Sequence, residues 1–215
     1  MGSTATWQPA APLEGDRSSD RPGRIGPNAV LQVFNALEEG HGVQEATRMA
    51  RLAGLSHHRE QAPATMIDER DVVALHKTVR NAMTGKEADQ ILWRAGERTA
   101  DYILANRIPK PVQIMLRALP AKLASRLLLK AIAKNAWTFA GSGTFAFTAG
   151  KPAILTLTDC PACTEVYAYN ERCAYYSATL QGLFQALAHK RSRIEDDLSL
   201  TTNGRVRRFV LDWPS

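Results

Sequence analysis

Three cysteines lie close together near the C-terminal end of this 215-residue sequence, and their spacing could serve metal chemistry. Cys160 and Cys163 form a Cys-x-x-Cys pair, and Cys173 follows ten residues later. Thiolates at this spacing are zinc ligands in many proteins, although a fourth ligand is not evident and His57 or His189 would have to supply it. The alternative is that all three are free thiols in the core or in a loop.

A second pattern is a long basic interval. Between Asp101 and Asp159 the sequence has no Asp or Glu, although the whole chain has 21 acidic and 27 basic residues. This interval should present a positive surface to anionic partners. Its cations alternate with leucines, so it offers apolar surface beside groups that pair with carboxylates. The candidate carboxylate partners are Arg107, Arg117, Arg126 and Lys130.

Two other interpretations of the basic interval stay open. Its helices could simply pack on the rest of the protein and expose a solvated basic face. They could also form a basic amphipathic surface that docks on anionic lipid, and added salt would then weaken the attachment.

Motifs for several other chemistries are absent from the sequence. The glycines at Gly23, Gly26, Gly141 and Gly143 do not follow the strand, turn and helix pattern of a dinucleotide site, so we expect no built-in NADPH. Hydrolase motifs are missing, and no nucleic-acid reader motif accompanies the basic residues. A flavin without a short signature or an external electron donor stays open.

Apolar residues at helical spacing dominate the first two thirds of the chain. Residues 1–23 have the composition of a disordered leader, and we expect one domain over 24–215. The first helix should follow Pro27, whereas His57 and His58 fall in a polar stretch that we expect to be an exposed loop. The predicted helices cover 28–39, 43–53, 66–83, 86–106, about 111–118, 120–135 and 174–190.

Strand patterns appear after the basic interval. Aromatic and β-branched residues predict strands over 137–148 and 153–158. Asn203-Gly204 is the preferred pair for a tight hairpin turn and predicts paired strands over 198–202 and 205–211. The order of elements indicates an α+β fold of the α/β sandwich kind, in which a helical N-terminal half packs on an antiparallel sheet.

The cysteine count and the N-terminus bear on the cellular location. Three cysteines do not make a disulfide framework, and the first residues lack the pattern of a signal peptide. Every apolar run is interrupted by charge before it reaches the length of a membrane span. We therefore expect a cytoplasmic protein whose membrane contact, if any, is peripheral.

Several separate segments resemble the bacteriochlorophyll-biosynthesis J proteins of purple phototrophs, a family with a 4-vinyl reductase domain. The similar segments are GRIGPNAVLQ at 23–32, RTADYILANRIP at 98–109, AWTFAGSG at 136–143, CAYYSATLQGLF at 173–184 and RFVLDW at 208–213. The resemblance implies an α/β domain related to small-molecule-binding modules. It also implies a role at the divinyl, magnesium-containing stage of bacteriochlorophyll synthesis, and it implies that any peripheral membrane contact is with the photosynthetic membrane.

The resemblance gives the basic interval a ligand class. A protein that holds Mg-protoporphyrin or divinyl protochlorophyllide needs a flat apolar slot, cations for the propionates and an axial ligand for magnesium. His76, on the apolar side of its predicted helix, is the first candidate for that ligand, and a satisfied core histidine is the alternative. Tyr102, Trp137 and Phe139 are further candidates to line the slot.

The resemblance also implies partners and an alternative activity. The partners are the large subunit of magnesium chelatase and the Mg-protoporphyrin methyltransferase, and a homodimer through a helical face is an open alternative. We expect a carrier of the pigment, with an 8-vinyl reductase of divinyl (proto)chlorophyllide as the alternative. Related domains often have further cysteines at positions that hold Leu198 and Arg207 here, which argues against a complete zinc site.

Overall fold

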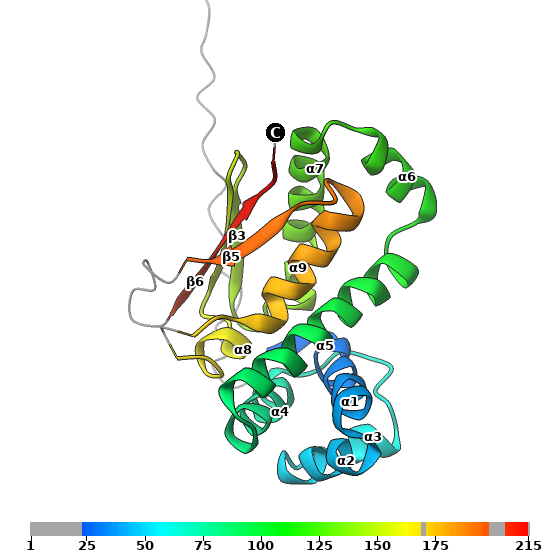
Figure 1. The fold of residues 1–215 in the computed structure, drawn as a ribbon, viewed down its shortest axis with the longest axis vertical. Coiled ribbons are helices and arrows are strands. Elements are labelled where there is room, and N and C mark those ends of the chain that lie inside the picture. Colours follow the sequence, from blue (N-terminus) through cyan, green and yellow to red (C-terminus); the bar gives the residue numbers. More distant parts are fainter. Residues whose placement is uncertain (1–22, 169–170, 198–204, 215) are drawn as a thin grey trace, which may run out of the picture.

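The computed structural model describes residues 23–168, 171–197 and 205–214. The predicted leader therefore lies outside the described residues, apart from Gly23. A helical lobe comes first, and an antiparallel sheet flanked by two helices follows it (Figure 1). Buried apolar side chains form one continuous cluster through both parts.

Amphipathic sequence accounts for the helical lobe. Asp68 caps α4 by accepting from the backbone N–H of Arg70, and Thr84 and Glu87 form a capping box at the start of α5. The elements of this lobe are β1 (Arg24–Ile25), α1 (Asn28–His41), α2 (Val43–Leu52), α3 (Ser56–Glu60), β2 (Ile67–Asp68), α4 (Glu69–Ala82) and α5 (Gly85–Asn106). The predicted helices in this part of the chain are confirmed. The sequence predicted an exposed loop at His57 and His58, but these residues lie in the helix α3, and His58 is buried.

Prolines separate the helices of the basic interval. Pro109 and Pro120 precede α6 and α7, where the absence of a backbone N–H costs nothing because that position lies before the first helical hydrogen bond. The elements of the second half are α6 (Lys110–Ala118), α7 (Ala121–Lys134), a 3₁₀ turn (Ala136–Thr138), β3 (Thr144–Thr148), β4 (Ala153–Thr158), α8 (Pro161–Thr164), α9 (Ala174–Leu187), β5 (Arg193–Asp196) and β6 (Val206–Asp212).

The four-stranded sheet has the order β3-β4-β6-β5, and every neighbouring pair is antiparallel. Leu155 pairs with Phe209, and both side chains are buried on the face that α9 and α7 cover (Figure 1). Strand residues alternate between buried and half-buried, which is the pattern of a sheet with one core face. The expected α+β class with an antiparallel sheet is therefore confirmed, but the sheet is covered by α7 and α9, and the N-terminal half packs on α9 through α5 instead of on the sheet.

One strand prediction is wrong in part, and another falls on residues that the structure does not describe. The segment 137–143 was predicted as strand but forms the 3₁₀ turn and a further turn, and only Thr144–Thr148 is extended. The predicted strand 198–202 and the Asn203-Gly204 turn lie outside the described residues. Among the described residues, the outer partner of β6 is β5, which the sequence analysis missed.

Candidate functional site

The helices α6 and α7 expose apolar side chains that a packed core would normally cover. Ile114 is 66% exposed, Met115 50% and Leu123 44%. Exposed apolar side chains that gather on a surface mark an interaction site. We define the α6–α7 surface by its exposed apolar residues and its cations: Val112, Ile114, Met115, Leu123, Leu127, Lys110, Lys122, Arg126, Lys130 and Lys134.

The cations of this surface lack acidic partners in the part of the chain that the structure describes. Among the described residues, the five basic side chains of the α6–α7 surface form no ion pair. Elsewhere in the described chain, cations such as Arg80, Arg94 and Arg98 bind carboxylates at 2.7 to 3.1 Å. The absence of acids between Asp101 and Asp159 thus leaves one part of the surface with unneutralised charge.

A cleft of about 290 Å³ opens beside this surface, between α7 and the turn that joins β3 to β4. Lys122 and Arg126 line it together with Ser125, Leu129, Ala149 and Gly150. The hydroxyl of Ser125 is buried and has no hydrogen-bond partner among the described residues. A buried hydroxyl without a partner is costly, and a ligand oxygen could satisfy it. Two cations and a hydroxyl donor suit a carboxylate.

The structure places the other predicted basic residues in different settings. Arg107 stacks over the ring of Tyr102 at 5.9 Å, at the C-terminal end of α5. Arg117 donates through Nε to the carbonyl of Ala186 at 2.9 Å, so it ties α6 to α9. Lys130 is exposed on α7, one turn after Arg126.

The two aromatic candidates after α7 differ in burial. Trp137 is 64% exposed, whereas Phe139 packs against the core and contacts the ring of Phe145 edge-on. The hydroxyl of Tyr176 donates to the Phe139 carbonyl at 2.6 Å. The described cleft therefore includes Arg126 but not Tyr102, Arg107, Arg117, Trp137 or Phe139.

His76 lies in the interior, with 1% of its surface exposed. Its Nε2 lies 2.9 Å from the carbonyl of Ala29, and its ring contacts Tyr175 edge-on. Nδ1 has no hydrogen-bond partner among the described residues. Burial lowers the pKa of His76 to about 4, so the imidazole is neutral at pH 7. A neutral imidazole is the form that binds metal, but this one has no open approach in the structure.

The three cysteines are all buried and free. The sulfurs of Cys163 and Cys173 lie 3.2 Å apart. Arg207 is also buried, and its guanidinium donates to the carbonyls of Glu171 and Ala168, in the loop between the two cysteines. A buried guanidinium near this loop disfavours a second cation, and zinc binding by the cysteines stays a prediction.

A larger hollow of about 750 Å³, which the sequence did not predict, lies at the same end of the sheet as the β3–β4 turn, between Pro152, the start of β5 and the end of β6. Its charged residues are of both signs, with Arg191 and Arg193 beside Glu195 and Asp212. This hollow therefore gives no preference for an anion. Lys122 and Ser125 were not predicted as ligand candidates, although Lys122 lies three and four residues before Ser125 and Arg126 and therefore beside them on the helix.

Comparison with known proteins gives a consistent set of relatives. The chain is 37% identical over 188 residues to the bacteriochlorophyll synthase 23 kDa chain of Cereibacter sphaeroides, covering 87% of this chain and 90% of that protein. It is 37% identical over 202 residues to the protein of the same name from Rhodobacter capsulatus, covering 94% and 91%. A scan of protein-family models finds no match.

Solved structures with a similar fold are H-NOX domains. A Cs H-NOX mutant with the unnatural amino acid 4-cyano-L-phenylalanine has a TM-score of 0.57 at 12% identity, covering 89% of this chain and 97% of that chain. A structure from a study of heme distortion in the H-NOX family has a TM-score of 0.56 at 12% identity, with coverages of 89% and 96%. The Fe(II) unliganded H-NOX protein from K. algicida has a TM-score of 0.53 at 13% identity, with coverages of 89% and 97%.

Proposed function

Because the chain belongs to the family of the bacteriochlorophyll synthase 23 kDa chain, we propose that it binds a magnesium tetrapyrrole and carries it between enzymes of bacteriochlorophyll biosynthesis. The relatives support the role in this pathway. The ligand, Mg-protoporphyrin or divinyl protochlorophyllide, and the carrier role are the proposal. Magnesium chelatase and the Mg-protoporphyrin methyltransferase are the proposed donor and acceptor of the pigment.

The observation that carries this proposal is that the α6–α7 surface combines exposed apolar side chains with cations that form no ion pair with any described residue. A magnesium tetrapyrrole has a flat apolar macrocycle with carboxylate arms. The cleft at Lys122, Ser125 and Arg126 is at the lower end of the size of small-molecule sites, so it suits one arm and not the whole macrocycle. Leu123 and Leu127, on the same helix, offer apolar contact to the ring.

The similarity in fold to H-NOX domains also supports the proposal, but only at the level of the fold. One H-NOX structure comes from a study of heme distortion in that family, so a protein family with this fold works with a tetrapyrrole. The proposal assigns no role to His76, because its complete burial closes the approach that a macrocycle would need.

A reductase of the 8-vinyl group is the second candidate, and it is favoured only by the family resemblance. Reduction of a vinyl group needs a hydride donor, and the sequence offers no dinucleotide motif. In a carrier, by contrast, the protein has only to bind, shield and release the pigment. The α6–α7 surface offers apolar contact and cations for binding a pigment, and this binding needs no cofactor.

A titration of the purified protein with Mg-protoporphyrin and with divinyl protochlorophyllide tests the proposal. Absorbance and fluorescence report binding, and NADPH is added afterwards to the same sample. We expect saturable binding with an unchanged 8-vinyl group. Arg126→Ala should weaken binding about tenfold, the value of one charge-assisted hydrogen bond. Arg51→Ala is the matched control, since Arg51 is an exposed helical arginine without an ion pair among the described residues.

Each other outcome has a definite meaning. Conversion to the monovinyl pigment by protein and NADPH alone would establish the reductase and overturn the carrier. Binding that is equally strong in the Arg126 and Arg51 variants would move the site away from α7. A protein that binds anionic vesicles but no pigment would show that the α6–α7 surface docks on lipid instead.

A further inference from the structure

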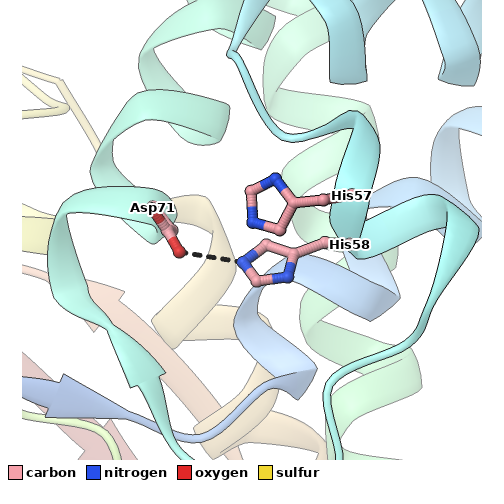
Figure 2. A group of neighbouring side chains, drawn as sticks. All are labelled: His57, His58 and Asp71. Atoms are coloured by element: carbon pink, nitrogen blue, oxygen red, sulfur yellow. Dashed lines mark hydrogen bonds and ion pairs between the residues drawn. The ribbon is translucent and has the colours of Figure 1, made fainter.

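His57, His58 and Asp71 form a cluster in the helical lobe that the proposed function does not use. The short helix α3 supplies the two consecutive histidines, and Asp71 lies in the first turn of α4. Figure 2 shows the two imidazoles one above the other, with the carboxylate of Asp71 facing His58. In Figure 1, α3 lies at the opposite end of the molecule from α6, so the cluster is separate from the α6–α7 surface.

The side chains converge closely. His58 Nε2 and Asp71 Oδ2 lie 2.8 Å apart, and the ring centroids of His57 and His58 are 4.0 Å apart. One ligand atom from each of the three residues lies within 4.8 Å of the others, and no other group of three or more His, Cys, Asp and Glu side chains in the described parts of the chain does so.

We propose that these three residues bind a divalent transition metal ion of the zinc type. Two imidazole nitrogens and one carboxylate oxygen are ligands that zinc takes at about 2.0–2.2 Å. Two such ligands of a tetrahedral ion lie about 3.3 Å apart. The cluster therefore needs only a small opening of the His58–Asp71 contact to admit the ion. Three protein ligands leave the fourth position to water or another small molecule.

The surroundings leave the donor atoms available. Among the described residues, the side chains of Asp71 and His57 make hydrogen bonds and ring contacts only within the cluster, and the charge of Arg70 attracts Asp71 from the neighbouring position. Neighbouring charges are already paired, since Arg59 binds Glu38 at 3.1 Å and Arg70 binds Asp68 at 2.6 Å. Neither arginine is therefore bound to the Asp71 carboxylate.

The three side chains of the cluster differ in exposure, so two of them are held by the protein and the third faces solvent. The His58 side chain is 10% exposed and that of Asp71 29%, whereas His57 is exposed. Arg59 holds α3 against α1 through Glu38 and through the ring of Phe34, at 5.5 Å from its centroid. The ion would enter from the side of His57 and join α3 to α4.

Cobalt(II) absorption tests the site, because cobalt substitutes for zinc and its spectrum reports the ligand atoms. The full chain is used without a histidine tag, after treatment with a chelator. We expect one equivalent of cobalt with visible bands of a low-symmetry site and without the near-ultraviolet band of thiolate ligands. Added zinc should displace the cobalt and raise the melting temperature, since an ion that binds only the folded state stabilises it.

Two variants keep the proposal falsifiable even if one residue also supports folding. His57→Ala removes an exposed ligand, and Asp71→Asn keeps the shape of the side chain. Each should weaken cobalt binding at least tenfold, because changes outside the ligand shell already cost this much. His41→Ala, an exposed histidine at the end of α1, should bind as the original protein does.

The remaining outcomes overturn the proposal. Absence of binding at one equivalent would show that the cluster is only an ion pair between α3 and α4. A thiolate band would assign the ion to Cys160, Cys163 and Cys173 instead, and binding that survives both variants without this band would place the ion at a different site.

Discussion

The carboxylate of Glu69 accepts a hydrogen bond of 2.7 Å from the backbone N–H of Ser142. Its other oxygen accepts from the N–H of Gly23 at 2.9 Å. A single buried side chain at the start of α4 therefore joins the beginning of the described chain to the turn before β3. These two backbone segments belong to stretches in which the sequence resembles its family.

Glu69→Gln should destabilise the protein by about 1–3 kcal/mol, because the amide nitrogen cannot accept and leaves one buried N–H without a partner. For a chain of this size the melting temperature should fall by about 2–4 °C for each kcal/mol. Glu60→Gln is the control, since Glu60 is exposed. Equal melting temperatures for the two variants would show that the Glu69 contacts contribute nothing net.

Sequence patterns predicted the helices well because each helix has an apolar face that a core must cover. They were wrong for 137–143, where aromatic and β-branched residues favour strand but local hydrogen bonds decide the conformation. The N–H groups of Phe139 and Ala140 donate to the carbonyl of Ala136, which closes the turn. Strand β5 was missed because Arg193, Glu195 and Asp196 leave Ile194 as its one apolar residue.

The candidate site, like the fold, could be predicted only in part from the sequence. The sequence predicts Arg126 as a cation in an acid-free interval, and the structure places it at a cleft. The unpartnered hydroxyl of Ser125 depends on how α7 faces the β3–β4 turn, which the spacing of residues does not encode. His58 was expected in an exposed loop because its neighbours are polar, and only the packing of α3 buries it.

Gly96 allows α5 and α9 to approach closely. A Cβ atom at this position would lie 2.3 Å from the Tyr175 carbonyl oxygen and 2.7 Å from the Ala178 Cβ. Gly96→Ala should therefore force the helices apart and cost about 1–3 kcal/mol or more in the free energy of unfolding. Gly85→Ala in the same helix meets open space and should be neutral or slightly stabilising. Denaturant unfolding of both variants measures the difference, and a neutral Gly96→Ala would contradict the close packing.

The buried cysteines should react slowly with a thiol reagent. Burial raises the pKa of Cys163 well above its usual value, so at pH 8 this group is a protonated thiol inside the protein. The hydrogen bond with Cys163 lowers the pKa of Cys160, but Cys160 is fully buried, so the reagent has no access to its sulfur. We expect Ellman's reagent to label little of the native protein within the time that labels free cysteine, and to label all three thiols after unfolding. Rapid labelling of one thiol in the native state would show that the α8 region opens in solution.

His76 should make stability fall as the pH is lowered from about 6.5 to about 4. Burial lowers its pKa to about 4 in the folded state, whereas the unfolded chain has an ordinary value near 6.5. Between these values the unfolded state binds a proton that the folded state does not, so acid favours unfolding. The loss should approach about 3 kcal/mol at pH 4 and stop growing below it, because both states are then protonated. His76→Gln keeps a donor for the Ala29 carbonyl but does not titrate, so its free energy of unfolding should lack this part of the pH dependence. Parallel pH profiles for the two proteins, measured by urea unfolding between pH 4 and pH 7, would show that His76 does not remain neutral in the fold.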